Sequence, residues 1–474
     1  MTDIINRIPL YRQIAQAVKA DIARHRLNPG DRISVRGLMS DYKAGKKAVV
    51  LALELLNEEG IAVSIPRTGT VISPDARNII LNTNTPDWHK LSASGLHKPN
   101  RSFVNTVDNK YEDTETRLSG YKYGFCEEEF HVYTPIRQAL DRIEKDGFAE
   151  IMNINNKKGL YWTCEAVAEH VKAYGIETTP ENIVLFNNSA QACNTIIYSY
   201  MRHGSNLYTM YTGLVGISEN ISTVGANRYW LDYDKEGISP EDLLKKVNPK
   251  KHNMLCITPV NQTPTGLTMS GKRRDEILEI SQRLQLPIME LDLFRDVWVK
   301  PPPRPLKSDD ENDQIIYIGG FSTMANSLIQ GAWAIAPKAT VARLYDVKFQ
   351  LYGFTNRFIE SLMCILLRNG FYRDNVETVR TLLKGRIHRI QKALEVLKGL
   401  AYYNPDSLSH YLWLEFNKGL DTNDFFTDYP EVNVLPGKLF YNSSALSMGS
   451  MSEPIEVMED YIRHFADWAK SKSR

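Results

Sequence analysis

Apolar residues near the N-terminus recur at the spacing of an α-helix. Within residues 9–26 they stand four positions apart, at Ile14, Val18 and Ile22, which predicts a helix with one buried face. A short helix is predicted over 35–41 and a longer one over about 46–59. The buried stripe of the longer helix would be formed by Val49, Ala52, Leu53 and Leu56.

Two short apolar segments, 61–64 and 70–73, follow the third helix and are predicted to be strands. Gly60 would end that helix, because glycine readily adopts the left-handed conformation that terminates many helices. The residues between the strands, Pro66-Arg67-Thr68-Gly69, are typical of a turn. Three helices followed by a two-stranded hairpin predict a winged helix-turn-helix domain over residues 1–75.

Beyond this domain the pattern changes twice. Residues 76–115 are polar and irregular, and we interpret them as a linker. From 116 to 474 short apolar strands alternate with helical segments such as 272–284. This alternation is typical of a mostly parallel sheet covered by helices on both faces. The strands are predicted at 183–186, 206–210, 254–259, 287–291 and 315–318.

The predicted fold is therefore multidomain, with a mostly helical winged helix-turn-helix domain followed by an α/β domain. The α/β domain would divide into a large part at about 150–370 and a small C-terminal α+β part at about 371–474. The small part is predicted to hold a long helix near 379–397, two strands and a closing helix near 454–470.

Composition and charge narrow the class of protein. The 474 residues carry a formal net charge of +1, and the composition is that of an ordinary globular protein. Residues 1–75 hold eleven Lys and Arg against eight Asp and Glu, a small excess that by itself says little about nucleic acid. No apolar run is long enough to span a bilayer, and no secretory signal or CxxC spacing is present. We therefore expect no metal site and a location in the reducing cytoplasm.

Several motifs of the N-terminal domain stand in a recognisable order. They are Pro9-Leu10-Tyr11, Pro29-Gly30-Asp31-Arg32, Ser34-x-Arg36-x-Leu38, Glu59-Gly60-Ile61 and Arg67-Thr68-Gly69-Thr70. In this order they resemble the GntR family of bacterial transcription regulators. The resemblance implies that double-stranded DNA is the partner and that it is contacted by Arg36, Gly45, Lys46, Lys47, Arg67 and Gly69. Lysine and arginine neutralise phosphates and read guanine edges, and glycine permits close approach of the backbone. Taken alone, Lys46 and Lys47 could equally be solvated charges at a helix start.

The rest of the chain carries a second set of motifs. Ile257-Thr258-Pro259, Pro264-Thr265-Gly266, the run from Met289 to Asp296 and the run from Tyr317 to Ser322 are followed by Pro436-Gly437. This set resembles the fold-type I pyridoxal-phosphate (PLP) aminotransferases, and its fusion to a GntR domain resembles the MocR subfamily. The resemblance implies a homodimer, because fold-type I proteins build their sites at a dimer interface.

At the positions that hold PLP in this family, the sequence has lost the required groups. Thr323 follows Gly319-Gly320-Phe321-Ser322 where the family has the Schiff-base lysine, and Gln330 replaces the phosphate-binding arginine. Leu291 and Phe294 stand for the ring-nitrogen Asp and the ring-oxygen Tyr. Thr263 replaces an Asn, and Ser447 replaces the arginine that grips a substrate carboxylate.

One residue and one segment of this pocket retain polar groups. Asp292 could replace the missing Asp only with a one-residue shift, which in a strand turns a side chain to the other face. Ser189-Ala190-Gln191 opens a helix whose amides could hold an anion, as any strand-to-helix turn could. The degenerate cofactor pocket, a candidate effector site, thus comprises Ser189, Ala190, Gln191, Thr263, Leu291, Asp292, Phe294, Ser322, Thr323, Gln330 and Ser447.

The leading hypothesis is a DNA-binding regulator without catalytic residues or cofactor. Its aminotransferase-like domain would serve as a dimerisation module and as a sensor of a small effector. The alternative is a PLP-dependent aminotransferase, or a PLP-sensing regulator, with an unconventional site. A purely structural repressor without any ligand is the third hypothesis.

Overall fold

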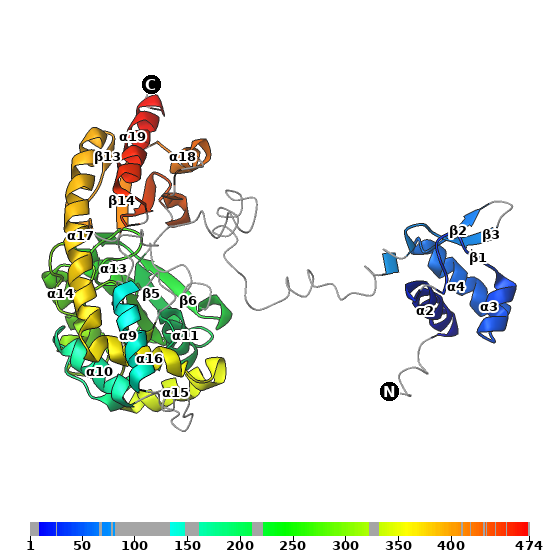
Figure 1. Ribbon diagram of the computed structural model, residues 1–474, viewed down its shortest axis with the longest axis horizontal. Coiled ribbons are helices and arrows are strands. Elements are labelled where there is room, and N and C mark those ends of the chain that lie inside the picture. The colour runs from blue at the N-terminus through cyan, green and yellow to red at the C-terminus, as the bar shows by residue number, and fades with distance from the viewer. Residues whose placement is uncertain are drawn as a thin grey trace. The chain divides into compact units, whose positions relative to one another are not determined.

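The chain divides into two compact units, Met1–Gly95 and Leu96–Arg474, shown in the computed structural model of Figure 1. The structure describes residues 9–24, 26–65, 69–76, 79–80, 133–146, 161–210, 221–321, 331–408, 411–417, 419–429, 432, 434–440, 442–451 and 453–472.

In its described residues, the first unit combines three helices with a small antiparallel sheet. The helices are α2 (Leu10–Ala23), α3 (Val35–Asp41) and α4 (Lys46–Glu58), and the strands are β1 (Arg32–Ile33), β2 (Ala62–Ile65) and β3 (Gly69–Ile72), in the order β1-β3-β2. All the predicted helices and both predicted strands are confirmed. The two-residue strand β1 was not predicted, because a pair of residues is too short to show alternation.

One apolar core holds this unit together. Ile14, Val18 and Ile22 of α2 are buried with Val49, Ala52 and Leu56 of α4, as the spacing predicts, whereas Leu53 is only partly buried. Ala76 and Ile80 belong to the same core, so the packing of the unit continues past residue 75.

The second unit is built on a seven-stranded sheet in the order β4-β12-β11-β10-β9-β5-β6. Strand β12 is antiparallel to both neighbours, and the remaining pairs are parallel. The predicted mostly parallel sheet is confirmed, with β6 and β12 added. The strands are β4 (Ile183–Phe186), β5 (Asn206–Met210), β6 (Asn227–Leu231), β9 (Asn253–Ile257), β10 (Ile288–Leu291), β11 (Ile315–Gly320) and β12 (Ala332–Ile335), with β7 (Tyr233–Asp234) and β8 (Gly237–Ile238) in a separate hairpin.

Helices cover both faces of this sheet (Figure 1). On one face, α11 (Ser189–Tyr200) and α15 (Lys338–Tyr352) pack over side chains that include Leu291 and Ile318. The opposite face is covered by α9 (Tyr133–Asp146), α10 (Tyr161–Lys172), α13 (Pro240–Lys246), α14 (Gly271–Leu284) and α16 (Arg357–Arg368).

The C-terminal part of the second unit has its own sheet and core. Strands β13 (Ala401–Tyr402), β14 (Tyr411–Phe416), β16 (Ala445–Gly449) and β15 (Leu435–Pro436) are antiparallel neighbours in that order. Helix α17 (Phe371–Leu394) runs along the unit (Figure 1), and its C-terminal half packs with α19 (Ile455–Lys472) in this core. The short helix α18 (Thr422–Asp428) and two of the four strands were not predicted.

Two further findings bear on the class of protein. In the parts of the chain that the structure describes, no helix is both long and apolar enough to cross a membrane. Among the same residues, no group of three or more His, Cys, Asp or Glu is placed to hold a metal ion.

Candidate functional site

The first candidate site is the exposed side of α3 and α4. Ser34 caps α3 by accepting a hydrogen bond from the Gly37 amide at 3.0 Å, and Arg36 is exposed on the first turn. Lys46 and Lys47 are the first two residues of α4, and both are exposed. Within the described residues none of these three cations forms an ion pair. The start of each helix thus presents unneutralised positive charge.

The two glycines predicted to approach DNA have different structural roles. Gly45 has φ −68° at the N-cap of α4, and a Cβ added there would meet no atom within 4 Å. The fold therefore does not require glycine at this position. Gly69 has φ +99°, and its Cβ would lie 3.2 Å from Nε of Arg32, so the wing itself requires glycine. Arg67 lies outside the described residues.

The second candidate site is the degenerate cofactor pocket. Leu291 is fully buried at the end of β10, in one apolar cluster with Ala192 and Cys193 of α11. The residue predicted to replace the family's carboxylate is thus an aliphatic side chain packed against α11. Ser322, Thr323 and Gln330 lie outside the described residues.

The first turn of α11 is capped by the chain itself. The side chain of Asn188 accepts a hydrogen bond from the Gln191 amide at 2.9 Å. The Gln191 side chain in turn accepts from the Asn187 amide at 3.4 Å. Ser189 and Ala190 lie in this turn. One of the amides that an anion would use is therefore already paired.

Positions far apart in sequence meet beside the Pro264-Thr265-Gly266 turn. Ser447 of β16 is fully buried and donates a hydrogen bond to the Pro264 carbonyl at 3.3 Å. Thr263 is half-buried next to Pro264. Phe294 stacks edge-on against Tyr411 at 5.8 Å between ring centroids. The structure therefore brings Ser447 against Pro264, the residue that follows Thr263.

Asp292 lies on the other face of the sheet, as predicted from the alternation of a strand. Its carboxylate is paired with Arg295 and accepts a hydrogen bond from the Tyr317 hydroxyl at 3.2 Å. Tyr317 belongs to the apolar cluster of α10 and α16. Asp292 therefore does not replace the missing carboxylate at Leu291.

Asp292 is one member of a buried polar network that our sequence interpretation missed. Glu290, fully buried, accepts hydrogen bonds from the amides of Leu306 (2.8 Å) and Lys307 (2.9 Å). Burial, together with repulsion from Asp292, raises the pKa of Glu290 to about 7. Charged residues at alternate positions of an otherwise apolar strand were the available signal.

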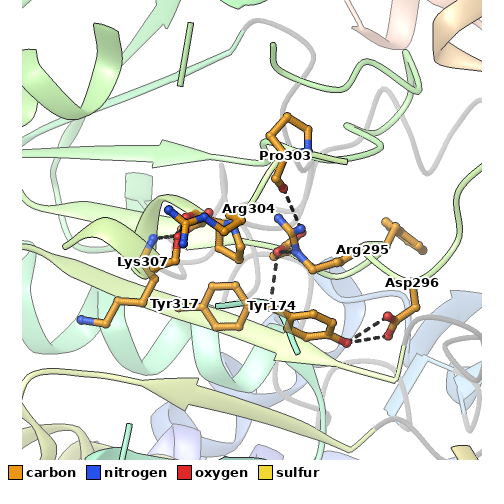
Figure 2. A network of polar contacts seen from close by, with 12 residues as sticks. Tyr174, Arg295, Asp296, Pro303, Arg304, Lys307 and Tyr317 are labelled. Carbon is orange, nitrogen blue, oxygen red and sulfur yellow. Dashed lines mark hydrogen bonds and ion pairs between the residues drawn. The ribbon is translucent and has the colours of Figure 1, made fainter. Parts of the chain in front are cut away.

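Asp296 forms the second half of the network. Its carboxylate accepts hydrogen bonds from the hydroxyls of Tyr174 (2.9 Å) and Tyr372 (2.7 Å), as Figure 2 shows for Tyr174. The Tyr174 hydroxyl also lies 2.8 Å from Nε2 of His170, and burial lowers the pKa of that imidazole. The guanidinium of Arg380 donates to the Asp296 carbonyl at 2.7 Å.

Comparison with known proteins identifies the family that the first unit matches. Residues 10–72 match the family described as bacterial regulatory proteins, gntR family. The uncharacterized HTH-type transcriptional regulator YdfD of Bacillus subtilis is 26% identical over 89% of this chain and 88% of its own length. YisV, from the same organism and with the same description, is 27% identical over 91% of this chain and 90% of its own length. The HTH-type transcriptional regulator NorG of Staphylococcus aureus is 21% identical over 86% and 92%.

Solved structures identify the fold of the second unit. An archaeal alanine:glyoxylate aminotransferase superposes with a TM-score of 0.73 at 19% identity, covering 82% of this chain and 100% of its own. The kynurenine aminotransferase of Pyrococcus horikoshii gives a TM-score of 0.71 at 17% identity, covering 83% and 98%. At these identities the likeness shows the fold alone.

The fold and the comparisons together define a helix-turn-helix protein of the GntR type joined to an aminotransferase-like unit. This is the architecture of the MocR-type regulators, and the helix-turn-helix relatives match it over most of the chain.

Proposed function

We propose that this protein is a DNA-binding transcription regulator whose aminotransferase-like unit does not catalyse a reaction. The observation that carries the proposal is the set of exposed, unpaired cations at the starts of α3 and α4, Arg36, Lys46 and Lys47. In a winged helix-turn-helix domain the recognition helix enters the major groove by its N-terminal residues. The names of the relatives, all HTH-type transcriptional regulators, support the same function.

The loss of catalysis is supported by the residues of the degenerate cofactor pocket. PLP chemistry needs a lysine for the internal Schiff base and a carboxylate that keeps the ring nitrogen protonated. The sequence has Thr323 for the lysine, and Leu291 is packed in an apolar cluster. The Gln191 amide is already paired with Asn188. These residues do not fit PLP.

The aminotransferase-like unit would serve instead as a dimerisation module and a sensor of a small molecule. The proposal of a homodimer rests on the resemblance to fold-type I proteins. A two-fold dimer presents two helix-turn-helix domains, so its operator would consist of two related half-sites. Sedimentation of the full chain tests this: a monomer at micromolar concentration would contradict it.

The direct test of the proposal is a DNA-binding titration with the full-length protein. The probes are the region upstream of the protein's own gene and a random fragment of equal length, each at three salt concentrations. We expect tighter binding to the upstream region and a steep loss of affinity with salt, because each phosphate contact releases counterions. Equal, weak binding to both fragments at all salt concentrations would contradict a sequence-specific regulator.

A further inference from the structure

A cavity formed by the described residues lies on the α10 face of the sheet, opposite the face where Leu291 packs. It has a volume of about 980 Å³, within the range of sites for small organic ligands. Its walls come from α10, the segment 295–304 and the start of α17. These segments are far apart in sequence, and the cavity includes the Asp296 half of the buried network.

The lining of this cavity is rich in cationic side chains. Six cations line it, Lys172, Arg295, Arg304, Arg368, Arg373 and Arg380. Each of them also pairs with a carboxylate: three of these carboxylates, Glu169, Glu165 and Asp296, belong to the lining, and the other three are Asp292, Asp309 and Asp374. A guanidinium has five N–H donors, so an arginine that is paired on one side can still donate to an anion. The five arginines of the lining can therefore offer hydrogen bonds to a negatively charged molecule.

Arg295 gives the clearest indication of a missing partner. It is 5% exposed, and it pairs with Asp292 and donates from Nη1 to the Pro303 carbonyl at 2.8 Å (Figure 2). Its Nη2 is buried and has no hydrogen-bond partner among the described residues. A buried charged donor without an acceptor is costly, and an anion in the cavity would bring oxygen acceptors to this side chain.

A flat surface for the rest of a ligand is provided by Trp298 and Arg380. The guanidinium of Arg380 lies 4.1 Å from the centroid of the Trp298 ring, and both residues line the cavity. Val297, the neighbour of Trp298, packs in the core of the C-terminal part. The cavity therefore joins the large sheet to the C-terminal part of the unit.

We propose that this cavity binds a small organic oxyanion, a carboxylate or a phosphate, with Arg295, Arg304, Arg373 and Arg380 as its cationic partners. Such a site is separate from the degenerate cofactor pocket and from DNA binding. In a regulator it would place effector recognition where the large sheet meets the C-terminal part, a consequence that rests on the function proposed above.

The test is ligand binding to the full-length protein without DNA, at constant ionic strength maintained with chloride. The probes are inorganic phosphate, succinate and citrate. Their binding is measured by thermal unfolding and by calorimetric titration. We expect saturable stabilisation by at least one probe, because a ligand that binds only the folded state stabilises it. Phosphate alone would identify a phosphorylated ligand class, and succinate or citrate a carboxylate class.

The variant pair Arg304→Ser with Arg373→Ser locates the site. Their side chains are 64% and 74% exposed, so the fold should tolerate both changes. We expect the dissociation constant to rise at least about tenfold. The matched control, Arg283→Ser with Arg463→Ser, removes the same charge from exposed positions outside the cavity. It should change the dissociation constant less than about twofold.

Two results would overturn the proposal. One is the absence of saturable stabilisation by any probe up to about 20 mM, a concentration that detects even millimolar affinity. The other is equal weakening in the cavity variant and its control, which would mean charge screening over the whole surface. Either result leaves the DNA-binding titration unaffected, so failure here is distinguishable from failure of the proposed function.

Discussion

Leu291 and Asp292 are neighbours in sequence, yet their side chains lie on opposite faces of the central sheet. Leu291 packs with Ala192 and Cys193 of α11, whereas Asp292 pairs with Arg295 and bonds the Tyr317 hydroxyl on the other face. A strand alternates its side chains between faces, so the retained carboxylate points away from the degenerate cofactor pocket.

Thr323→Lys alone should not restore transamination. The new amine could form an imine with PLP, but Leu291 offers no carboxylate to the ring nitrogen and Ser447 no cation to a substrate. Each missing group costs on the order of a hundredfold or more in rate. The measurement is amino-acid turnover with added PLP. The unmodified protein should give no Schiff-base absorbance band on titration with PLP. Turnover by the single variant would contradict the roles that we predict for the positions of Thr323, Leu291 and Ser447.

Replacing Lys46 and Lys47 together with Ala should weaken operator binding and flatten its dependence on salt. Each phosphate contact that is lost lowers the slope of log affinity against log salt by about one. Both side chains are exposed, so stability should hardly change. The control is Lys250→Ala with Lys251→Ala, an exposed lysine pair in the second unit. If both double variants bind DNA like the original protein, α4 does not enter the groove.

Gly45→Ala and Gly69→Ala should separate DNA contact from folding. At Gly45 the backbone is ordinary and a Cβ meets nothing within 4 Å, so the first unit should keep its stability while DNA affinity falls. At Gly69, φ of +99° and the close Arg32 side chain predict a loss of about 1 kcal/mol or more in stability. Thermal unfolding measures the stability of both variants, and DNA titration measures their affinity. The prediction would be contradicted if the Gly69→Ala variant were more stable than the Gly45→Ala variant.

Lys348→Met should stabilise the second unit at neutral pH. Lys348 is 2% exposed, its ammonium bonds the Thr355 hydroxyl, and burial lowers its pKa to about 8. Below pH 8 the lysine is charged in both the folded and the unfolded chain, so the folded state bears the full cost of burying the charge. That cost is roughly 3 kcal/mol, and it falls as pH rises from 8 to 10.5, where the unfolded lysine also loses its proton.

The gain from Lys348→Met should therefore be largest at pH 7 and decline towards pH 10. Chemical denaturation at several pH values measures it. Lys338→Met is the matched control, because Lys338 starts the same helix and is exposed. A gain that is independent of pH would mean that packing, and not the buried charge, is responsible.

The winged helix-turn-helix domain could be predicted almost completely from the sequence. Its helices show strong periodicity, and the predicted strands of the hairpin agree with β2 and β3 within one residue. In the second unit β4 and β5 were predicted with their exact bounds. Each of these elements is specified by residues that are near one another in the chain, which is why local spacing was sufficient.

Local spacing could not reveal which distant residues meet. The bonds from Tyr174 and Tyr372 to Asp296 join positions 122 and 76 residues apart, and the Ser447 bond to Pro264 spans 183. The helix α18 and the antiparallel strand β12 also escaped prediction, because their environment comes from neighbours far away in sequence. Such contacts exist only when the sheet has assembled.

The sequence by itself therefore determined the domain order and the helix-turn-helix motif, since each depends on residue identity and short-range spacing. Only the tertiary structure decided that Asp292 pairs with Arg295, that Arg295 is buried with a donor that has no partner among the described residues, and that six cations line one cavity. The physical reason is that charge and burial act through space, and their partners are set by packing between segments that the chain keeps far apart.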